Sequence, residues 1–304
     1  MTAAFQPSRP SFADSRLLAL AIARIAPSDG DYETAIPGLT LHRRRAVTQP
    51  MHCIYGLGLG ITAQGEKQVV LGERVLRFGP GQSLLTAVDL PVVSTVVEGS
   101  HTEPFLGLML HLAPQDILQL ATELRLPSPS RDRGFCSMAV EPLTEGLLDA
   151  LLRLVQLLSE PVLLPYLAPL VQREIAYRLL TGPHGAQLRH LINQEAPSQQ
   201  IACAINWLKR HFTEPLKIEQ LAASCHMSPS TLRQHFRTIT GLSPLQYQKQ
   251  LRLQEARQLM LTQNLDASVT AARVGYESAS QFSREYARLF GEPPQRDIRR
   301  LRLN

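Results

Sequence analysis

The chain has 304 residues, 44% of them hydrophobic, which is long enough for two domains and apolar enough to bury a sizeable core. No apolar run approaches the ~18 residues that span a membrane, and the N-terminus lacks the basic start and long apolar stretch of a signal peptide. The four cysteines are widely spaced without a CxxC pair, so no disulfide framework or zinc site is indicated. We therefore expect a cytoplasmic protein with free thiols.

The net charge of +5 is distributed unevenly. Residues 200–304 hold 15 Lys and Arg against 8 Asp and Glu, whereas residues 1–199 hold 16 against 18. A basic module attracts polyanions, nucleic acid above all, although basic surfaces are common. The charge pattern therefore predicts a mildly acidic module followed by a basic one.

The first half of the chain reads mainly as strands. A short helix over 16–25 is followed, from about residue 38 to 112, by short apolar and β-branched runs that alternate with Gly, Pro and Asp. Such a series is typical of short strands joined by tight turns. We expect an antiparallel sandwich or barrel here.

Helical spacing appears over 114–125 and again over 143–180. In the second stretch one apolar stripe is followed by leucines on a second side; the stripe is Leu147, Leu151, Leu154 and Leu158, and the second side is Leu148, Leu152 and Leu157. Two interpretations remain open, an internal core helix and a helix that packs against a second copy of the chain. The polar segment 193–200 is the best inter-domain linker.

The remainder reads as helix and contains an internal repeat at an offset of fifty residues. The matched pairs are Ala222 with Ala272, Ser228 with Ser278, Leu232 with Phe282, Phe236 with Tyr286, Gly241 with Gly291, and Pro244 with Pro294. Each copy reads as a short helix, a tight turn, a serine cap, a second helix, a Gly stop and a Pro. This pattern predicts two helix-turn-helix units, with a long helix between them that starts at Ser243-Pro244.

The second helix of such a unit lies in the major groove of DNA. Spacing points Leu232, Phe236 and Ile239 inward in the first copy, and Phe282, Tyr286 and Leu289 inward in the second. The outward candidates for DNA contact are Ser230, Thr231, Arg233, Gln234 and Arg237 in the first copy, and Ser280, Gln281, Ser283, Arg284 and Arg288 in the second. Ser, Gln and Arg suit base edges and phosphates, and Arg237 and Arg288, one turn later, suit phosphates. Taken singly, several of these side chains could also belong to a merely solvated face.

The second copy, VGYESASQFSREYARLFGEPP, resembles the signature of AraC/XylS transcription regulators, and the resemblance covers roughly residues 203–301. It implies two helix-turn-helix subdomains, joined by the long helix, that read successive segments of the major groove. His226 departs from it, because the first turn usually carries Gly at this position. His is enriched among non-Gly residues with positive φ, so we expect a strained but intact turn.

The segment 38–125 resembles the cupin-like N-terminal domain of a subgroup of these regulators, which implies a sensing or dimerisation domain. His42, His52, His101 and His111 fall here, but they form no HxH pair and none follows where a second cupin motif would place it. We therefore predict no metal site and no cofactor. Because neither GxSxG nor a Walker sequence occurs, we predict no catalytic residues. The alternative is a cupin-like enzyme or metal-binding sensor with a DNA-binding tail.

Together these features predict an α+β chain. A cupin-like antiparallel β-barrel with flanking helices spans 1–192, a linker spans 193–200, and an all-α domain of two helix-turn-helix units joined by a long helix spans 201–304. We expect a sequence-specific transcription regulator that binds double-stranded promoter DNA and is not an enzyme. The resemblance adds RNA polymerase and a second copy of the chain as partners, leaves room for a small-molecule effector, and favours an activator.

Overall fold

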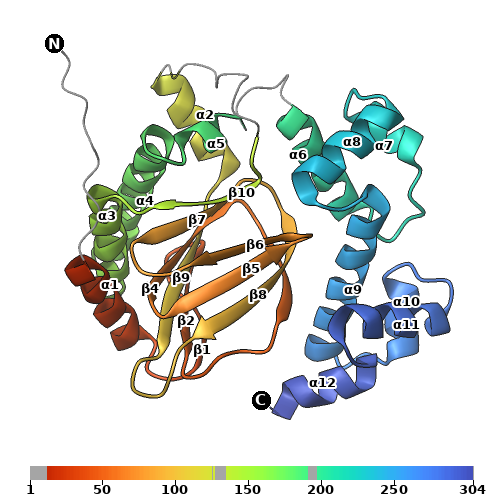
Figure 1. Ribbon diagram of the computed structural model, residues 1–304, viewed down its shortest axis with the longest axis horizontal. Coiled ribbons are helices and arrows are strands. Elements are labelled where there is room, and N and C mark those ends of the chain that lie inside the picture. Colours follow the sequence, from red (N-terminus) through yellow and green to blue (C-terminus); the bar gives the residue numbers. More distant parts are fainter. Residues whose placement is uncertain (1–11, 125, 127–134, 191–196, 304) are drawn as a thin grey trace. The chain divides into compact units, whose positions relative to one another are not determined.

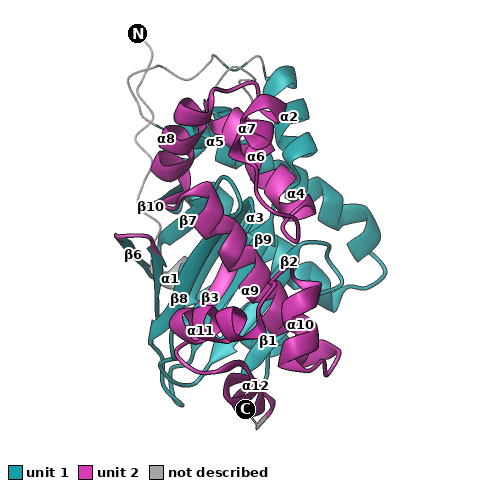
Figure 2. Cartoon of the chain, turned by 90° about the vertical axis from the view of Figure 1, so that its right-hand side faces the viewer, with its two compact units in different colours: residues 1–51, 55–70, 74–196 teal, residues 52–54, 71–73, 197–304 magenta. Residues whose placement is uncertain are grey.

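The computed structural model describes residues 12–124, 126, 135–190 and 197–303 (Figure 1). The described chain divides into two compact units, with the main boundary between residues 196 and 197 (Figure 2). The pieces 52–54 and 71–73 carry the colour of the second unit in Figure 2 but belong to a strand and a hairpin of the N-terminal sheets, and they are described there. The first part of the predicted linker, 193–196, lies outside the described residues.

The N-terminal unit begins with helix α1 (Phe12–Ile25) and is built on two sheets. The six-stranded sheet has the order β1 (Gly30–Glu33), β2 (Leu39–Arg44), β9 (Phe105–His111), β4 (Gly58–Gln64), β7 (Gln82–Thr86) and β10 (Met138–Pro142). The four-stranded sheet has the order β3 (Met51–Tyr55), β8 (Leu90–Glu98), β5 (Glu66–Leu71) and β6 (Arg74–Phe78). The pairings along the first sheet, and β5 with β8 in the second, are antiparallel.

One face of the six-stranded sheet is apolar because leucines alternate along its strands. Leu59 of β4 lies opposite Leu110 of β9, and Ile61 lies opposite Leu108, so these side chains line the same face. Leu18 and Ile22 of α1 are fully buried in the same core. The alternation of apolar residues therefore gives the sheet an apolar face, and a layer of helices covers that face (Figure 1).

That layer contains α2 (Pro114–Glu123), α3 (Glu145–Gln156), a 3₁₀ turn η1 (Leu157–Ser159), α4 (Leu164–Thr181) and α5 (Gly185–His190). Helix α1 packs on β4 and β9, α3 packs on α1, and α4 packs on α3. Of the seven leucines, Leu147, Leu148, Leu151, Leu154 and Leu157 are buried within this one unit, whereas Leu152 and Leu158 are half-buried. Internal packing therefore explains most of these leucines, which favours the interpretation of α3 as an internal core helix.

Two strands, β1 and β10, were not predicted from the sequence. They are the edges of the six-stranded sheet, where β1 pairs with β2 and β10 pairs with β7. Their sequences, GDYE and MAVEP, are short and carry charged residues, because an edge strand buries little of its surface. The predicted α+β class with an antiparallel N-terminal domain is confirmed.

The C-terminal unit consists of helices within the described residues. They are α6 (Pro197–Arg210), α7 (Ile218–Ser224), α8 (Pro229–Thr240), α9 (Pro244–Thr262), α10 (Ala267–Arg273), α11 (Ala279–Phe290) and α12 (Pro294–Leu303). Helix α6 starts inside the segment predicted as linker. Figures 1 and 2 show α9 running between the group α6–α8 at one end and the group α10–α12 at the other.

Helix α9 begins where predicted, with a capping box in which the Ser243 hydroxyl accepts from the Gln246 amide and the Gln246 side chain accepts from the Ser243 amide. Its first half supports the first group, since Tyr247 packs edge-on against Phe236 with ring centroids 5.4 Å apart. Its second half supplies Leu253, Ala256 and Met260 to the core of the second group. One continuous helix therefore carries both groups.

Candidate nucleic-acid interface

The helix pairs α7–α8 and α10–α11 have the same backbone hydrogen-bond pattern in the turn between their helices. In the first turn the amide of His226 donates to the Ala223 carbonyl and that of Met227 donates to the Ala222 carbonyl. In the second, Gly275 donates to Ala272 and Tyr276 donates to Ala271 in the same pattern. His226 has φ 55° and Gly275 has φ 88°. The positive φ expected at His226 is confirmed, Gly275 adopts the same conformation in the second turn, and each turn ends its helix with the left-handed C-terminal motif.

The hydrogen bonds correct the predicted repeat by one residue in its first helix. Ala222 is equivalent to Ala271, and both are buried, with 0% and 1% of their surface exposed. Ala272, the predicted match, faces solvent. The offset is 49 residues through the first helix and the turn, and it becomes 50 from the serine cap onward. The second turn contains one more residue before the serine cap than the first turn does. A comparison at a constant offset of fifty residues cannot detect such an insertion.

Both second helices have the same local ends. The Ser228 hydroxyl caps α8 by accepting from the Thr231 amide, and the Ser278 hydroxyl caps α11 by accepting from the Gln281 amide. Gly241 and Gly291 close these helices with φ 74° and 83°. The start and stop signals in the sequence therefore define two helices of twelve residues each.

The inner faces of α8 and α11 hold the units together. Leu232, Phe236 and Ile239 are buried in the first unit, and Phe282 and Tyr286 in the second, while Leu289 is half-buried against the same core. These positions agree with the helical spacing.

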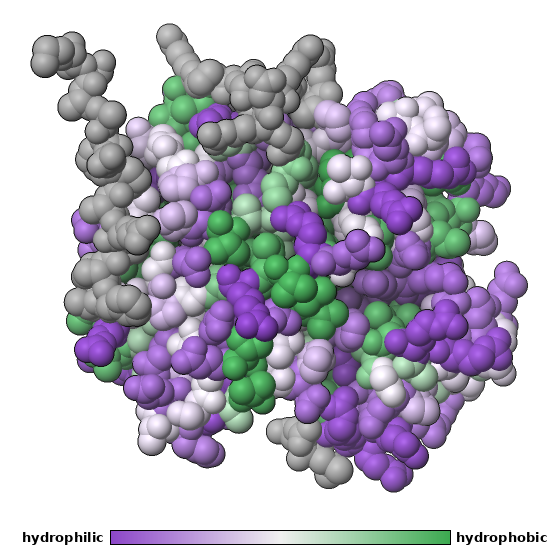
Figure 3. All heavy atoms as spheres, in the orientation of Figure 1, coloured by the Kyte–Doolittle hydropathy of each residue, from purple (hydrophilic) through white to green (hydrophobic). Residues whose placement is uncertain are grey.

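The outer faces carry the predicted contact residues. Those exposed are Ser230, Arg233, Gln234 and Arg237 on α8, and Ser280, Gln281, Arg284 and Arg288 on α11, whereas Thr231 and Ser283 are half-buried. The Thr231 hydroxyl lies 2.7 Å from the Ser228 hydroxyl, within the helix cap. Hydrophilic side chains also gather over α10–α12 in the space-filling view (Figure 3).

A buried ion cluster that the sequence analysis missed fixes the inner face of α11. Asp297 of α12 is fully buried and accepts two hydrogen bonds of 2.8 Å from the Arg257 guanidinium, one of 2.7 Å from Arg300 and one of 2.8 Å from the Tyr286 hydroxyl. Burial raises the pKa of Tyr286, and the hydrogen bond to Asp297 raises it further. Tyr286 therefore remains a neutral donor, and α9, α11 and α12 are joined by this carboxylate.

A second cluster lies nearer the start of α11. Glu285 accepts from the Lys249 ammonium at 2.7 Å, from the Tyr276 hydroxyl at 2.9 Å and from the Gln281 amide at 3.1 Å. Burial acts to raise the pKa of Glu285, but the hydrogen bonds from Lys249, Gln281 and Tyr276 outweigh it and lower the pKa overall. Gln281 is therefore partly engaged with its own helix, which leaves Arg284 as the exposed cation next to this cluster.

Arg252 of α9 connects the two groups of helices. Its guanidinium donates to the carbonyls of Phe212 and Glu214, in the segment between α6 and α7, and to the carbonyl of Gly275 in the second turn, at 2.5, 2.8 and 2.8 Å. One side chain therefore binds the backbone of both groups of helices, α6–α8 and α10–α12. No sequence pattern marked Arg252, since its partners are backbone carbonyls 23 to 40 residues away.

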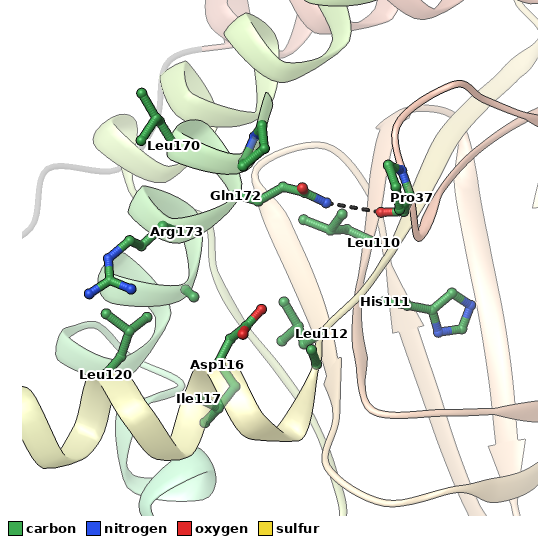
Figure 4. A pocket seen from close by; sticks show the side chains of 13 residues that line it. Pro37, Leu110, His111, Leu112, Asp116, Ile117, Leu120, Leu170, Gln172 and Arg173 are labelled. Carbon is green, nitrogen blue, oxygen red and sulfur yellow. Dashed lines mark hydrogen bonds between the residues drawn. The ribbon is translucent and has the colours of Figure 1, made fainter. Parts of the chain in front are cut away.

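The N-terminal unit contains a separate pocket of about 460 Å³ (Figure 4). Its apolar wall includes Leu110, Ile117 and Leu120, and Asp116, Leu170 and Arg173 lie at its rim. The Gln172 amide donates to the Pro37 carbonyl at 2.9 Å and so ties α4 to the loop before β2.

Within the described residues, no three His, Cys, Asp or Glu side chains are grouped so that they could hold a metal ion. In the same part of the chain, no helix has both the length and the apolar character to cross a membrane.

Comparisons with known proteins match both units. Residues 35–187 match the family model of the AraC-type transcriptional regulator N-terminus, and residues 221–300 match that of a helix-turn-helix domain. The transcriptional activator RhaS of Escherichia coli is 34% identical over 109 residues, which cover 35% of this chain and 38% of RhaS. The uncharacterised regulator YobQ of Bacillus subtilis is 32% identical over 92 residues, 30% of this chain and 38% of YobQ. These matches thus span about two fifths of the relatives' length.

The architecture of the whole chain also has a counterpart. ToxT from Vibrio cholerae, solved with a bound unsaturated fatty acid, aligns over 86% of this chain and 94% of its own with a TM-score of 0.60 and 10% sequence identity. At that identity the likeness concerns the fold. The two family models together with the duplicated helix-turn-helix show that this chain belongs to the AraC/XylS family of transcriptional regulators.

Proposed function

We propose that the C-terminal unit binds double-stranded promoter DNA by placing α8 and α11 in successive segments of the major groove. The observation that carries this proposal is the pair of capped helices with buried apolar inner faces and exposed Arg, Gln and Ser on their outer faces. Such side chains are suited to base edges and phosphates. Because α9 carries both units on one rigid helix, the two contacts are coupled in one binding event.

The proposed contacts differ in their roles. Arg233 and Gln234 on α8 and Arg284 on α11 lie in the first halves of their helices and are exposed, so we assign them to base edges. Arg237 and Arg288 lie one turn later, and we assign them to phosphates. Ser230, Thr231, Ser280, Gln281 and Ser283 complete the surface near the helix starts. The Thr231 hydroxyl and the Gln281 amide already have intramolecular partners, so we expect smaller effects from their replacement.

For the N-terminal unit we propose two regulatory roles. The pocket of about 460 Å³ is of a size that holds a small molecule, and its largely apolar wall with a polar rim fits an apolar effector that has one polar end. An effector acts only through different affinities for the two states of the regulator.

The second role is homodimerisation through the outer face of α4. Tyr166, Leu170 and Tyr177 expose 74%, 63% and 46% of their surface along this helix. An apolar stripe of this kind on a surface helix marks an interaction site. Tyr166→Glu should shift the chain towards a monomer in sedimentation measurements, and an unchanged mass would refute this surface.

Activation of transcription through RNA polymerase completes the proposal, since RhaS is named as an activator. The test of the main proposal is selection of binding sites from random duplex DNA by the full chain, followed by gel-shift titration of the selected site and a scrambled one. We expect the scrambled site to bind at least 10³-fold more weakly, as specific regulators do. Equal affinity for both would make the chain a non-specific DNA-binding protein and would refute the assignment.

A further inference from the structure

Two thiols of the first helix-turn-helix unit lie side by side. Cys203 is on α6 and faces solvent, whereas Cys225, the first residue after α7, is 2% exposed. The Cys203 thiol donates to the Ser224 carbonyl at 3.7 Å, and the Ser224 hydroxyl lies 3.7 Å from the Cys225 sulfur. Both thiols therefore lie next to the same residue, Ser224, one beside its carbonyl and the other beside its hydroxyl. An accessible cysteine thus lies close to a second, sheltered one.

We propose that Cys203 and Cys225 form a redox modification site, at which a peroxide or another two-electron oxidant converts the two thiols into an intramolecular disulfide. Redox-sensing cysteines are characteristically accessible and placed next to a second cysteine that resolves the oxidised form. This pair has that arrangement, with Cys203 as the residue attacked and Cys225 as the resolving residue.

The environment of Cys225 supports this order of events. Burial raises the pKa of the Cys225 thiol to about 12, and the hydrogen bond with Cys203 adds to the effect. Cys225 is therefore protonated at neutral pH and reacts poorly with an oxidant by itself, since the thiolate is the nucleophile. The exposed Cys203 is the group that an oxidant in solution can reach.

The chemistry balances with hydrogen peroxide as the oxidant. The Cys203 sulfur attacks one peroxide oxygen, the O–O bond breaks, and Cys203 becomes a sulfenic acid while one water is released. The Cys225 sulfur then attacks the Cys203 sulfur, the S–O bond breaks, and the Cys225 proton leaves with the hydroxyl group as a second water. The two thiols lose two electrons and two protons, and a dithiol reductant reverses the reaction by exchange.

The disulfide would act on the turn that precedes α8. A disulfide requires its sulfurs to approach to about 2.05 Å, which is closer than a contact between two thiols. Cys225 donates its amide to the Ala222 carbonyl at 3.2 Å and adjoins His226, the non-Gly residue held at φ 55°. A shift of Cys225 therefore moves a strained turn only three residues before the cap of α8. The expected loss of DNA binding rests on the proposed function, whereas formation of the disulfide does not.

The first experiment maps the disulfide in the full chain. Reduced protein is treated with equimolar hydrogen peroxide, free thiols are blocked, and the peptides are identified by mass spectrometry. We expect a linked Cys203–Cys225 peptide pair two hydrogen masses lighter than its reduced components, which a dithiol reductant abolishes. The Cys53→Ser/Cys136→Ser variant should form the same link, and Cys203→Ser should not. Failure of the link to form, or links only between different chains, would overturn the proposal.

The second experiment measures binding to the selected duplex site before oxidation, after oxidation and after reduction. We expect oxidation to weaken binding about tenfold or more, because one misplaced base-reading side chain already has that effect, and reduction to restore it. Cys203→Ser, a change at an exposed position, should bind like the reduced chain under all three conditions. If the disulfide forms but affinity is unchanged, the site has no regulatory role; if the reduced chain itself shows no specific binding, the proposed function has failed.

Discussion

Gly275 and Gly291 offer a matched pair of substitutions, because both have positive φ but only one is enclosed. Gly275 has φ 88° and Gly291 has φ 83°. A Cβ atom on Gly275 would lie against the carbonyl oxygen of Thr213, with the Thr213 Cα only 2.9 Å away, whereas a Cβ on Gly291 would have no neighbour within 4 Å. The backbone around Thr213 is also held by Arg252 through the carbonyls of Phe212 and Glu214, so it has little freedom to move.

Two contributions determine how much unfolding free energy each substitution costs: the left-handed backbone conformation and the steric overlap of the new Cβ atom. Gly291→Ala should cost about 1–2 kcal/mol of unfolding free energy, from the left-handed conformation alone. Gly275→Ala carries the same backbone term and an overpacking term of about 1–3 kcal/mol, because the atoms it meets are backbone atoms and not flexible side chains. The two variants should therefore differ by about 1–3 kcal/mol, with Gly275→Ala the less stable.

Denaturant unfolding of the full chain provides the assay. Trp207 is the only tryptophan of the chain and lies on α6, so its fluorescence reports on the C-terminal unit. Gly275→Ala should also lose specific DNA binding, whereas Gly291→Ala should retain most of it. Equal unfolding free energies for the two variants, or a more stable Gly275→Ala, would refute the close approach of the second turn to Thr213.

Three further predictions concern single side chains. Arg284→Ala should weaken binding to the specific site by about 1–3 kcal/mol, whereas Arg299→Ala, an exposed arginine outside both recognition helices that removes the same charge, should have a much smaller effect in gel-shift titration. Asp297→Asn should lower the unfolding free energy by about 3–5 kcal/mol, because it leaves the largely buried Arg257 charge uncompensated, whereas Arg300 keeps its ion pair with Glu292. The exposed control Asp149→Asn should cost less than about 1 kcal/mol, and similar losses would refute the buried cluster. His184 is 2% exposed, and burial lowers its pKa from 6.5 to about 4, although the Ser83 hydroxyl lies 2.9 Å from its Nε2. Between these two pKa values the unfolded chain binds more protons, so the stabilisation is complete above pH 6.5 and is lost as the pH falls towards 4. Relative to His184→Gln, the wild-type chain should lose about 3 kcal/mol of unfolding free energy across this window, and parallel pH profiles for the two would contradict the burial of a neutral imidazole.

Local signals predicted the elements of the C-terminal unit well. Ser228 and Ser278 act as caps, and His226 and Gly275 adopt positive φ, because each of these features depends only on residues within one or two turns. The error in the repeat has the same origin. A single extra residue in the second turn changes the register of the preceding helix, and only the turn's own hydrogen bonds reveal it.

Long-range contacts were the features that the sequence analysis could not supply. Asp297 and Arg257 form an ion pair although they are 40 residues apart in the sequence. Arg252 donates to backbone carbonyls, which every residue type has, so the sequence does not mark its partners. The leucines of α3 posed a related difficulty, since an apolar helix surface has the same pattern whether its partner is the same chain or another copy. In the N-terminal unit, the edge strands β1 and β10 were too short and polar for a pattern of alternation to register.

The central claim is that α8 and α11 read two separate segments of one duplex. Binding-site selection with the wild-type chain, with Arg233→Ala/Gln234→Ala and with Arg284→Ala tests it directly. We predict that each variant loses base preference in a different block, and that the two blocks lie about one helical turn, roughly 10 base pairs, apart. Loss of preference at the same positions in both variants, or at none, would contradict the claim.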